Sequence, residues 1–571
     1  MDPFLQLEYP FAQRAALELL LLCGVAAALG PWIVLRGLAF FAHAVGTAAF
    51  PGLIAADALG ITPQIGAAAG AAIVSSGAGV IRPRGRDGSR TALWLTGALA
   101  VGAILASDVT HSGAGVEAAL FGSLFATSTV DIALAATAAV LGAIGALTAG
   151  PRWLASGLTG RSVGHWDSLL LALVALAAIA QLAAAGALLA SALLVLPAVA
   201  ARPWCKRLHH WQALTAVGAT VVSASGLMLA LYLDVPPGAT IAVIAGLLVP
   251  NSYLLDAARK RAPQAKLMAT AVSGIVLLAV AGCGGSAKPG EVVATTPIAG
   301  DLASTIAGPD LTVRTMIPAG VDPHDYEPRP SDIVALAEAR LMVTSGSGID
   351  SWAAGLLDRS GGSAPILDLA RATPIKLPGD SPGTNDPHWF HDPRNAAAAA
   401  EALARQFASL DPAHATNYRA RAKRFSDQAM RLDQAGRACI ARLTPSQRTL
   451  VTDHDAFAYL VSRLNLRLAG TVIPAQSSTA APSARDLDRL ASRIRDLHVR
   501  AIFPERALAP KLANALAAQT GADASTQLDG DTLGPKGTTS ASWAGMWASN
   551  VNRIAAALSD QNIQCHLRAT R

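Results

Sequence analysis

Three histidines and one aspartate stand in loops of the second half of this chain, and their types suit a metal ion. The loops are fixed by proline or glycine, and the four residues are His324, His388, His454 and Asp531. Three neutral imidazoles and one carboxylate match the tetrahedral preference of zinc. Calcium or magnesium would call for mostly oxygen ligands, and a thiolate site would need paired cysteines. The set therefore predicts a site for zinc, although a nitrogen-rich site also binds other late transition metals such as copper and nickel.

Several neighbouring residues compete for the same roles. Asp529 is an alternative to Asp531 as the carboxylate ligand, and His391 is an accessory or entry ligand if it is not a supporting or surface residue. Glu505 is a further acidic candidate, whose alternative is a surface ion pair with Arg506. Any single histidine on a loop is unremarkable, so the prediction depends on the context that the four residues share.

Short β-rich runs alternate with helical patterns in this half, which is typical of α/β units with parallel sheets. The expected strands are 291–296, 311–316, 341–344, 449–452 and 501–503, with a helix capped by Ser331. The candidate ligands follow strands, where open α/β sheets place ligands. Asp411 and Pro412 supply the N-cap and the first turn of a helix, and the residues from Ala413 to about 442 contain one glycine and no proline, which gives ~45 Å of helix at ~1.5 Å per residue. We expect this long backbone helix (about 412–442) between lobe 1 (about 291–410) and lobe 2 (about 443–571).

The first half has the composition of a membrane protein. The chain of 571 residues is 52% apolar, and the excess is concentrated before Cys283. Runs long enough to cross a ~30 Å hydrocarbon layer occur near 15–35, 38–58, 63–81, 91–107, 131–150, 168–200, 211–233 and 238–256. The net charge of +6 is explained by basic residues in the short loops between these runs, so nucleic acid is not an expected partner. We assign 1–258 to an all-α polytopic membrane domain.

Basic residues indicate the orientation of these spans, because they favour the cytoplasmic side. The clusters are Arg36, Arg82 to Arg90, Arg152 with Arg161, Arg202 to Arg207, and Arg259 to Arg261. The chain must cross an even number of times between Arg161 and Arg202, so the run 168–200 is divided around 184–186. This gives about nine spans with the amino terminus outside.

Ionisable side chains within the spans are few, and each is costly in lipid. Glu18 and His43 are the clearest candidates for a translocation pathway. The alternative for His43 is an imidazole satisfied by a neighbouring helix.

The junction 259–290 has the order of an export signal. A basic head at 259–266 precedes an apolar run to Gly282, and Val280-Ala-Gly-Cys283 resembles a bacterial lipobox, with lipidation at Cys283. The alternative is one more transmembrane helix. Either reading delivers the second half outside, where Cys439 and Cys565 are candidates for a disulfide.

Four segments of the membrane half form a recognisable series: Arg36 through His43 to Pro51-Gly52, 121–124, 196–202 and 231–238. In this order they resemble the permease subunits of zinc and manganese ABC importers, with one departure at Ala42, where that family has Ser. The chain has no Gly-x-x-x-x-Gly-Lys-Ser/Thr phosphate loop. The resemblance therefore implies a separate cytoplasmic ATPase, with a second permease copy as a further possible partner in a homodimer.

The second half resembles the cluster A-I substrate-binding proteins of the same importers. The motifs are 323–328, Asp-Pro-His388 with Asp-Pro393, 454–457 and 531–535, and the family's ligands fall on His324, His388, His454 and Asp531. Manganese members commonly have Glu at the position of His454, so zinc is favoured. The segment 378–384 is short and lacks the His-rich loop of many zinc members.

These features together predict high-affinity zinc uptake by a fused permease and binding protein, with zinc as cargo and no enzymatic activity. It would lie in a bacterial plasma membrane as a multi-pass protein, in contact with lipid and with its carboxyl-terminal domain outside. A manganese importer is the nearer alternative. A membrane-anchored zinc hydrolase is the alternative of another class, and an inactive fusion that senses or tethers metal is a third.

Overall fold

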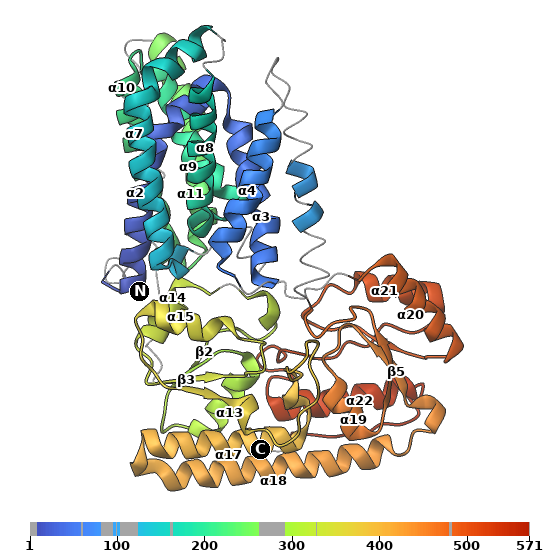
Figure 1. Cartoon of the computed structure of the whole chain (residues 1–571). Helices are drawn as coiled ribbons and strands as arrows, with labels where there is room; N and C mark the ends of the chain where they lie inside the picture. The colour runs from blue at the N-terminus through green and yellow to red at the C-terminus, as the bar shows by residue number, and fades with distance from the viewer. Residues whose placement is uncertain are drawn as a thin grey trace.

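The chain folds into a bundle of apolar helices and an α/β domain below it (Figure 1). The computed structural model describes residues 8–58, 61–80, 95–98, 100–102, 124–159, 164–261, 292–326, 328–478 and 482–569. The junction with Cys283, and most of the span expected at 91–107, lie outside these residues.

The bundle is built from helices of the membrane half. They are α2 (Pro10–Arg36), α3 (Ala39–Ala58), α4 (Pro63–Val80), α7 (Thr129–Thr159), α8 (His165–Ala180), α9 (Leu182–Ala201), α10 (Leu208–Leu233) and α11 (Pro237–Arg261), with 3-10 turns at Leu124–Ala126 and Arg202–Trp204. Among the described residues, five helices are long and apolar enough to cross a membrane: α2, α3, α7, α10 and α11.

The run 168–200 is divided at two points, one of them within 184–186, where the break was predicted. Helix α8 ends at Ala180 and α9 begins at Leu182. Gly186 then interrupts α9 with φ 66° and ψ 171°, a backbone conformation that only glycine adopts without strain. The expected break at 184–186 therefore corresponds to this interruption, whereas the helix boundary itself lies at Gln181.

Helices α3 and α4 pack closely because both carry glycine where they meet. A Cβ atom added at Gly52 would lie 2.0 Å from the backbone oxygen of Gly66. In a membrane there is no hydrophobic driving force between helices, so they associate by close packing, which small residues allow.

Lobe 1 contains a parallel sheet of four short strands. They are β1 (Val292–Ala294), β2 (Val313–Thr315), β3 (Leu341–Thr344) and β4 (Ile366–Asp368), in the order β2-β1-β3-β4. Val292 pairs with Val313 on one side and Leu341 on the other. The helices of this lobe are α13 (Pro297–Ala307), α14 (Pro330–Ala337), α15 (Trp352–Ser360), α16 (Leu369–Ala372) and α17 (Pro393–Leu410).

Lobe 2 contains a parallel sheet of three strands. They are β5 (Thr449–Thr452), β6 (Arg467–Thr471) and β7 (Ile502–Phe503), in the order β6-β5-β7. Its helices are α19 (Ala458–Leu464), α20 (Ala484–Asp496), α21 (Lys511–Thr520) and α22 (Trp543–Leu558). Both sheets are parallel, as the alternation of strands and helices in the sequence predicts.

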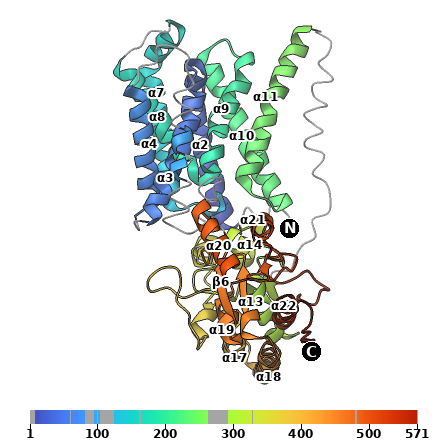
Figure 2. The ribbon, with the colours of Figure 1, turned by 90° about the vertical axis from the view of Figure 1, so that its right-hand side faces the viewer.

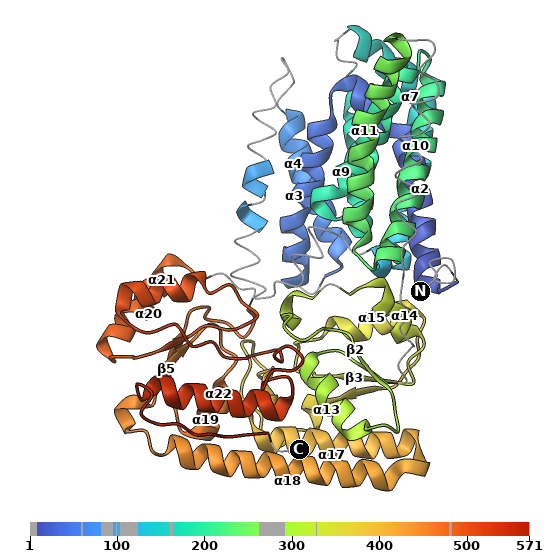
Figure 3. The same cartoon turned by 180° about the vertical axis from the view of Figure 1, so that it is seen from behind.

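Helix α18 (Ala415–Ile440) runs with α17 along the side of the domain that is farthest from the bundle (Figures 1 and 2). It begins later than expected, because Pro412–His414 forms a separate 3-10 turn. The carboxylate of Asp411 accepts hydrogen bonds from Tyr418 and His414 instead of capping the helix. Phe425 of α18 packs on Trp543 of α22 with ring centroids 5.1 Å apart, and Figure 3 shows α22 above α18.

The disulfide lies at the end of this helix. Cys439 of α18 is bonded to Cys565, 126 residues later. Cys23 and Cys205, in the membrane half, are free and buried.

Candidate metal centre

The four predicted ligands converge on one point between the lobes. One ligand atom from each of His324, His388, His454 and Asp531 lies within 4.8 Å of the other three. His324 and His388 come from lobe 1, whereas His454 and Asp531 come from lobe 2. The group is buried: the exposed fraction is 9% for the His324 side chain and 3% or less for the other three.

The carboxylate of Asp531 is the centre of the cluster. The Nε2 atoms of His324, His388 and His454 each lie 3.1 Å from one of its oxygens. Ligands ~2.0 Å from a tetrahedral zinc ion are separated by ~3.3 Å. These Nε2 atoms and both Asp531 oxygens are buried without a hydrogen-bond partner among the described residues. Buried polar atoms are normally satisfied, so a cation fits the space that they enclose.

The ligands are positioned by loops at the carboxyl ends of parallel strands. His324 follows β2 in a 3-10 turn (Pro323–Asp325), and His454 comes two residues after β5. His388 precedes a second 3-10 turn (Trp389–His391) in the long connection from β4 to α17. This edge of an open parallel sheet is where such folds bind ligands.

Two of the imidazoles are oriented by carboxylates. The Nδ1 atom of His388 lies 2.7 Å from Asp386 Oδ1, and the Nδ1 atom of His454 lies 2.6 Å from Glu505 Oε1. A carboxylate that accepts the Nδ1 proton leaves Nε2 free as a ligand and increases its basicity. Both Nε2 atoms face Asp531, so each ring is held in the tautomer that a metal requires.

These contacts set the protonation of the ion-free site. Burial alone would lower the pKa of His388, but the charges of Asp531 and Asp386 raise it to about 10. The pKa of His454 is likewise raised well above its usual value, against the effect of burial, by Glu505 and Asp531. Burial would raise the pKa of Asp531, but the two positive imidazoles hold it well below its usual value. Protons therefore occupy the site at neutral pH, and a metal ion must displace them.

The accessory candidates lie beside the cluster rather than in it. Asp529 is buried and forms ion pairs with Arg506, at 2.6 Å, and with Arg553, at 3.0 Å. Arg506 is thus paired with Asp529, and the alternative of a surface pair between Glu505 and Arg506 is wrong. His391 is fully buried against the ring of Phe457, 4.9 Å away, which removes the surface role considered for it. Burial and the positive charge of His388 lower the pKa of His391 to about 3.

Two aspartates that precede the candidate ligands of lobe 1 have a role that was not predicted from the sequence. Asp322 and Asp386 each accept a hydrogen bond from the backbone N–H of the histidine two residues later, at 2.9 Å in both cases. The repeated Asp-Pro-His sequence was the available signal, because an aspartate bonded to its own backbone two residues on forms an Asx turn. Asp322 also accepts from Ser478 of lobe 2, so this turn contributes to the closure of the two lobes.

The membrane candidates lie apart from this cluster. Glu18 is fully buried in α2 and accepts a hydrogen bond from Thr127. His43 Nδ1 in α3 lies 3.2 Å from the hydroxyl of Ser191 in α9. The neighbouring helix thus provides the partner that the alternative reading of His43 expects.

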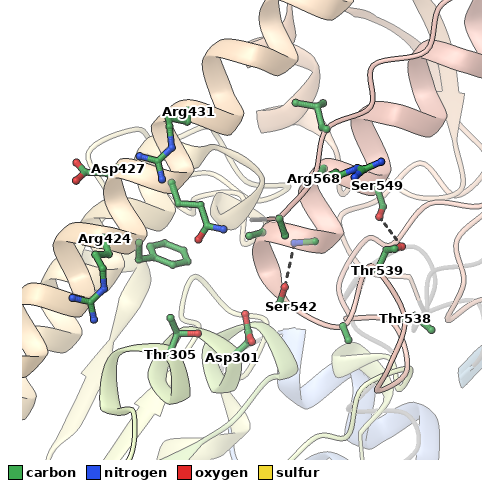
Figure 4. A pocket seen from close by; sticks show the side chains of 18 of the residues that line it. Asp301, Thr305, Arg424, Asp427, Arg431, Thr538, Thr539, Ser542, Ser549 and Arg568 are labelled. Atoms are coloured by element: carbon green, nitrogen blue, oxygen red, sulfur yellow. Dashed lines mark hydrogen bonds between the residues drawn. The ribbon is translucent and has the colours of Figure 1, made fainter. Parts of the chain in front are cut away.

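A separate cavity of about 1140 Å³ lies between α13, α18 and α22 (Figure 4). Arg424 and Arg431 reach it from α18, and Arg568 reaches it from the carboxyl-terminal segment. None of the described residues that line it is a histidine or a cysteine. Its side chains are therefore unsuited to a late transition metal, and the four-residue cluster is the candidate metal centre.

Comparison with known proteins assigns each half to a family. Residues 8–255 match the ABC 3 transport family, and residues 292–557 match the family described as zinc-uptake complex component A periplasmic. The manganese-binding lipoprotein MntA of Bacillus subtilis is 31% identical over 47% of this chain and 89% of its own length. The iron-binding protein YfeA of Yersinia pestis is 29% identical over 44% of this chain and 81% of its own. The zinc-binding protein TroA of Treponema pallidum is 26% identical over 47% and 90%, respectively.

These matches confirm the predicted fusion. They describe transporter components rather than enzymes, and an ABC importer implies an ATPase partner and a membrane setting. The relatives are named for manganese, iron and zinc, so they agree on a divalent metal and not on which one. The chain belongs to the metal ABC importers, with an ABC 3 family permease and a ZnuA-type binding domain in one polypeptide.

Proposed function

We propose that this protein takes up zinc, which its outer domain captures with His324, His388, His454 and Asp531. The observation that carries the proposal is the convergence of three unpartnered Nε2 atoms on one buried carboxylate, at 3.1 Å each. Zinc in protein sites is bound by nitrogen and oxygen ligands in this number and geometry.

The choice of zinc over manganese follows from the donor set. Manganese favours oxygen-rich sites of higher coordination number, and its affinity for a given nitrogen-containing site is below that of zinc. Here only one of the four groups is a carboxylate. Glu505 is bonded to Nδ1 of His454, on the far side of the ring from the other three groups.

A zinc hydrolase is a poorer fit to the same site. Catalytic zinc keeps one position open for water and has three protein ligands. Four protein groups here would fill a tetrahedral shell. The buried cluster suits capture and release of an ion rather than activation of water.

For the membrane half, we propose about nine spans with the amino terminus outside and the metal domain on the outer face. Helix α18 would serve as the backbone between the lobes within the domain boundaries given above. Cys283 would be the lipidated residue, and Glu18 and His43 would line the path of the ion. Two copies of the permease would pair and use an ATPase supplied by a separate chain.

Metal titration of the purified full chain tests the specificity. We expect one zinc ion per chain, bound more tightly than manganese by at least about tenfold, as their order of affinity for nitrogen-containing sites requires. Equal or tighter binding of manganese would overturn the zinc assignment. Uptake of radioactive zinc by cells that express the chain with a matched ATPase tests transport, and uptake that survives deletion of residues 11–250 would overturn that part.

A further inference from the structure

The hydrogen bonds described between the two halves all involve lobe 1. Asp234 lies in the turn between α10 and α11, and its carboxylate accepts from both the backbone N–H and the hydroxyl of Ser331, at 2.9 and 2.7 Å. Tyr9, just before α2, donates to Glu338, and Arg14 of α2 donates to the carbonyl of Arg359. The membrane half thus holds lobe 1 at two places.

An apolar contact supports these bonds. Phe11 of α2 belongs to one buried cluster with Leu336 of α14 and Leu357 of α15. A Cβ atom at Gly361, which ends α15 with φ 84°, would lie 3.1 Å from Pro10. Figures 1 and 3 show α14 and α15 directly beneath the bundle.

Asp234 contacts the first turn of α14, where free backbone N–H groups and the helix dipole favour a negative charge. The sequence predicted Ser331 as the cap of this helix, but α14 begins at Pro330. Ser331 therefore lies inside the first turn, and its polar groups are directed to the membrane half. A carboxylate from another domain thus binds this turn in addition to the local Asp332, which accepts a hydrogen bond from the backbone N–H of Arg329.

The same turn is bonded to the loop that carries His324. Asp332, next to Ser331, accepts hydrogen bonds from the hydroxyl of Tyr326 and from Arg314. Arg314 also donates to the hydroxyl of Ser331, at 2.9 Å. Tyr326 is two residues from His324, so a continuous chain of hydrogen bonds joins Asp234 to this ligand loop.

We infer that Asp234 seats lobe 1 on the membrane half of the same chain and that Asp332 and Tyr326 couple this seat to the loop of His324. A shift of the α10–α11 turn would displace the start of α14 and, through Tyr326, the first ligand. His388 and His454 are anchored by Asp386 and Glu505, which do not contact this chain of bonds. This inference rests on the proposed function, because it assigns the step that begins metal release.

Cysteine cross-linking in the full chain tests the seat. Asp234→Cys with Ser331→Cys, in a background without the free cysteines, should form a disulfide that mass spectrometry of the digested chain detects. The control pair combines Asp234→Cys with Ser304→Cys, an exposed position on α13 of the same lobe. Cross-linking equal to that of the control, or none, would overturn the seat.

A double-mutant cycle tests the coupling, with zinc alone as the probe and the full chain as the protein. The change in zinc affinity caused by Tyr326→Phe should differ at least about fivefold between chains with Asp234 and with Asp234→Asn, the lower end of measured coupling between sites. Asp427→Asn, on the exposed face of α18, replaces Asp234→Asn in the control cycle and should be additive. Additivity within about twofold for Asp234→Asn would overturn the coupling.

The metal site and the seat of lobe 1 can be refuted separately. A wild-type chain that binds no zinc would refute the proposed function. Normal zinc binding without the cross-link would refute the seat and leave the metal site intact. Thermal unfolding of each variant shows whether it is folded before its affinity is compared.

Discussion

Lobe 1 and lobe 2 each present a histidine oriented by a carboxylate, but they obtain that carboxylate differently. In lobe 1, Asp386 is two residues from His388. In lobe 2, Glu505 is 51 residues from His454, and the pair forms because β5 and β7 are adjacent in the sheet. One orientation is local to a turn, whereas the other requires the folded lobe.

The two lobes also differ in how they are held. Lobe 1 is bonded to the membrane half through Asp234 and Ser331, whereas the described hydrogen bonds of lobe 2 lead to lobe 1, to α18 and within itself. Gly320 of lobe 1 donates to Thr532 of lobe 2 beside the cluster. The ion is thus expected to join a lobe that is anchored on the membrane half to a lobe whose described hydrogen bonds all stay within the metal-binding domain.

The largest effect should follow loss of the carboxylate that joins the lobes. Asp531→Ala leaves three buried imidazoles without their common partner, and we expect zinc affinity to fall by at least about a thousandfold, as for the breaking of a buried charged pair. Competition with a chelator of known affinity measures this. Asp427→Asn is the matched surface control, and a loss below about tenfold for Asp531→Ala would contradict its role.

The second largest loss of zinc affinity should come from changes to the carboxylates that orient His388 and His454. Asp386→Asn and Glu505→Gln should each weaken zinc by about 10- to 100-fold, the usual range for groups that orient a metal ligand. In mild denaturant the contribution of Glu505 to zinc affinity should disappear before that of Asp386, because the contact between Glu505 and His454 depends on the sheet of lobe 2. If either variant binds zinc as the wild type does, the comparison between the lobes fails at that residue.

The pH dependence should have opposite signs for stability and for binding. The pKa of His388 is raised from 6.5 to about 10, so its stabilisation of the ion-free protein is complete below about pH 6.5 and is lost as the pH rises through about 10. Zinc needs the neutral ring, so its affinity should rise over the same interval. Calorimetry at pH 7 in buffers of different ionisation enthalpy should detect the release of at least one proton per zinc ion bound. Asp386→Asn should release fewer protons per ion. Binding without proton release would contradict this assignment.

The smallest effect on zinc affinity should come from removal of the disulfide. Replacement of both Cys439 and Cys565 by serine should lower the free energy of unfolding by about 2–5 kcal/mol, because the bond closes a long loop in the unfolded chain. Zinc affinity should change little, since neither residue is part of the cluster. Chemical denaturation measures the free energy of unfolding. A loss of zinc affinity as large as that expected for Glu505→Gln would show that the carboxyl-terminal segment with Cys565 shapes the site.

Local sequence features predicted part of this molecule well. Strands β3 and β5 have the expected bounds, because each is a run of buried apolar or β-branched residues. Strands β4 and β6 were missed, since each begins at an exposed residue and neither is a continuous run of buried residues. Such a pattern is too weak to be recognised alone.

The candidate site, too, was predicted only in part from local sequence features. The four candidate ligands were predicted from their loops and motifs, and the structure brings them together, but their supporting contacts depend on tertiary structure. Glu505 reaches His454 only because β7 lies beside β5. The bond from Ser331 to Asp234 spans 97 residues and joins two domains, so no local pattern around α14 indicates it.

X-ray absorption spectroscopy of the zinc-loaded full chain tests the central claim most directly. We predict a four-coordinate ion with three imidazole nitrogens and one carboxylate oxygen at ~2.0–2.1 Å. Zinc held by sulfur, or by no more than one imidazole, would contradict it.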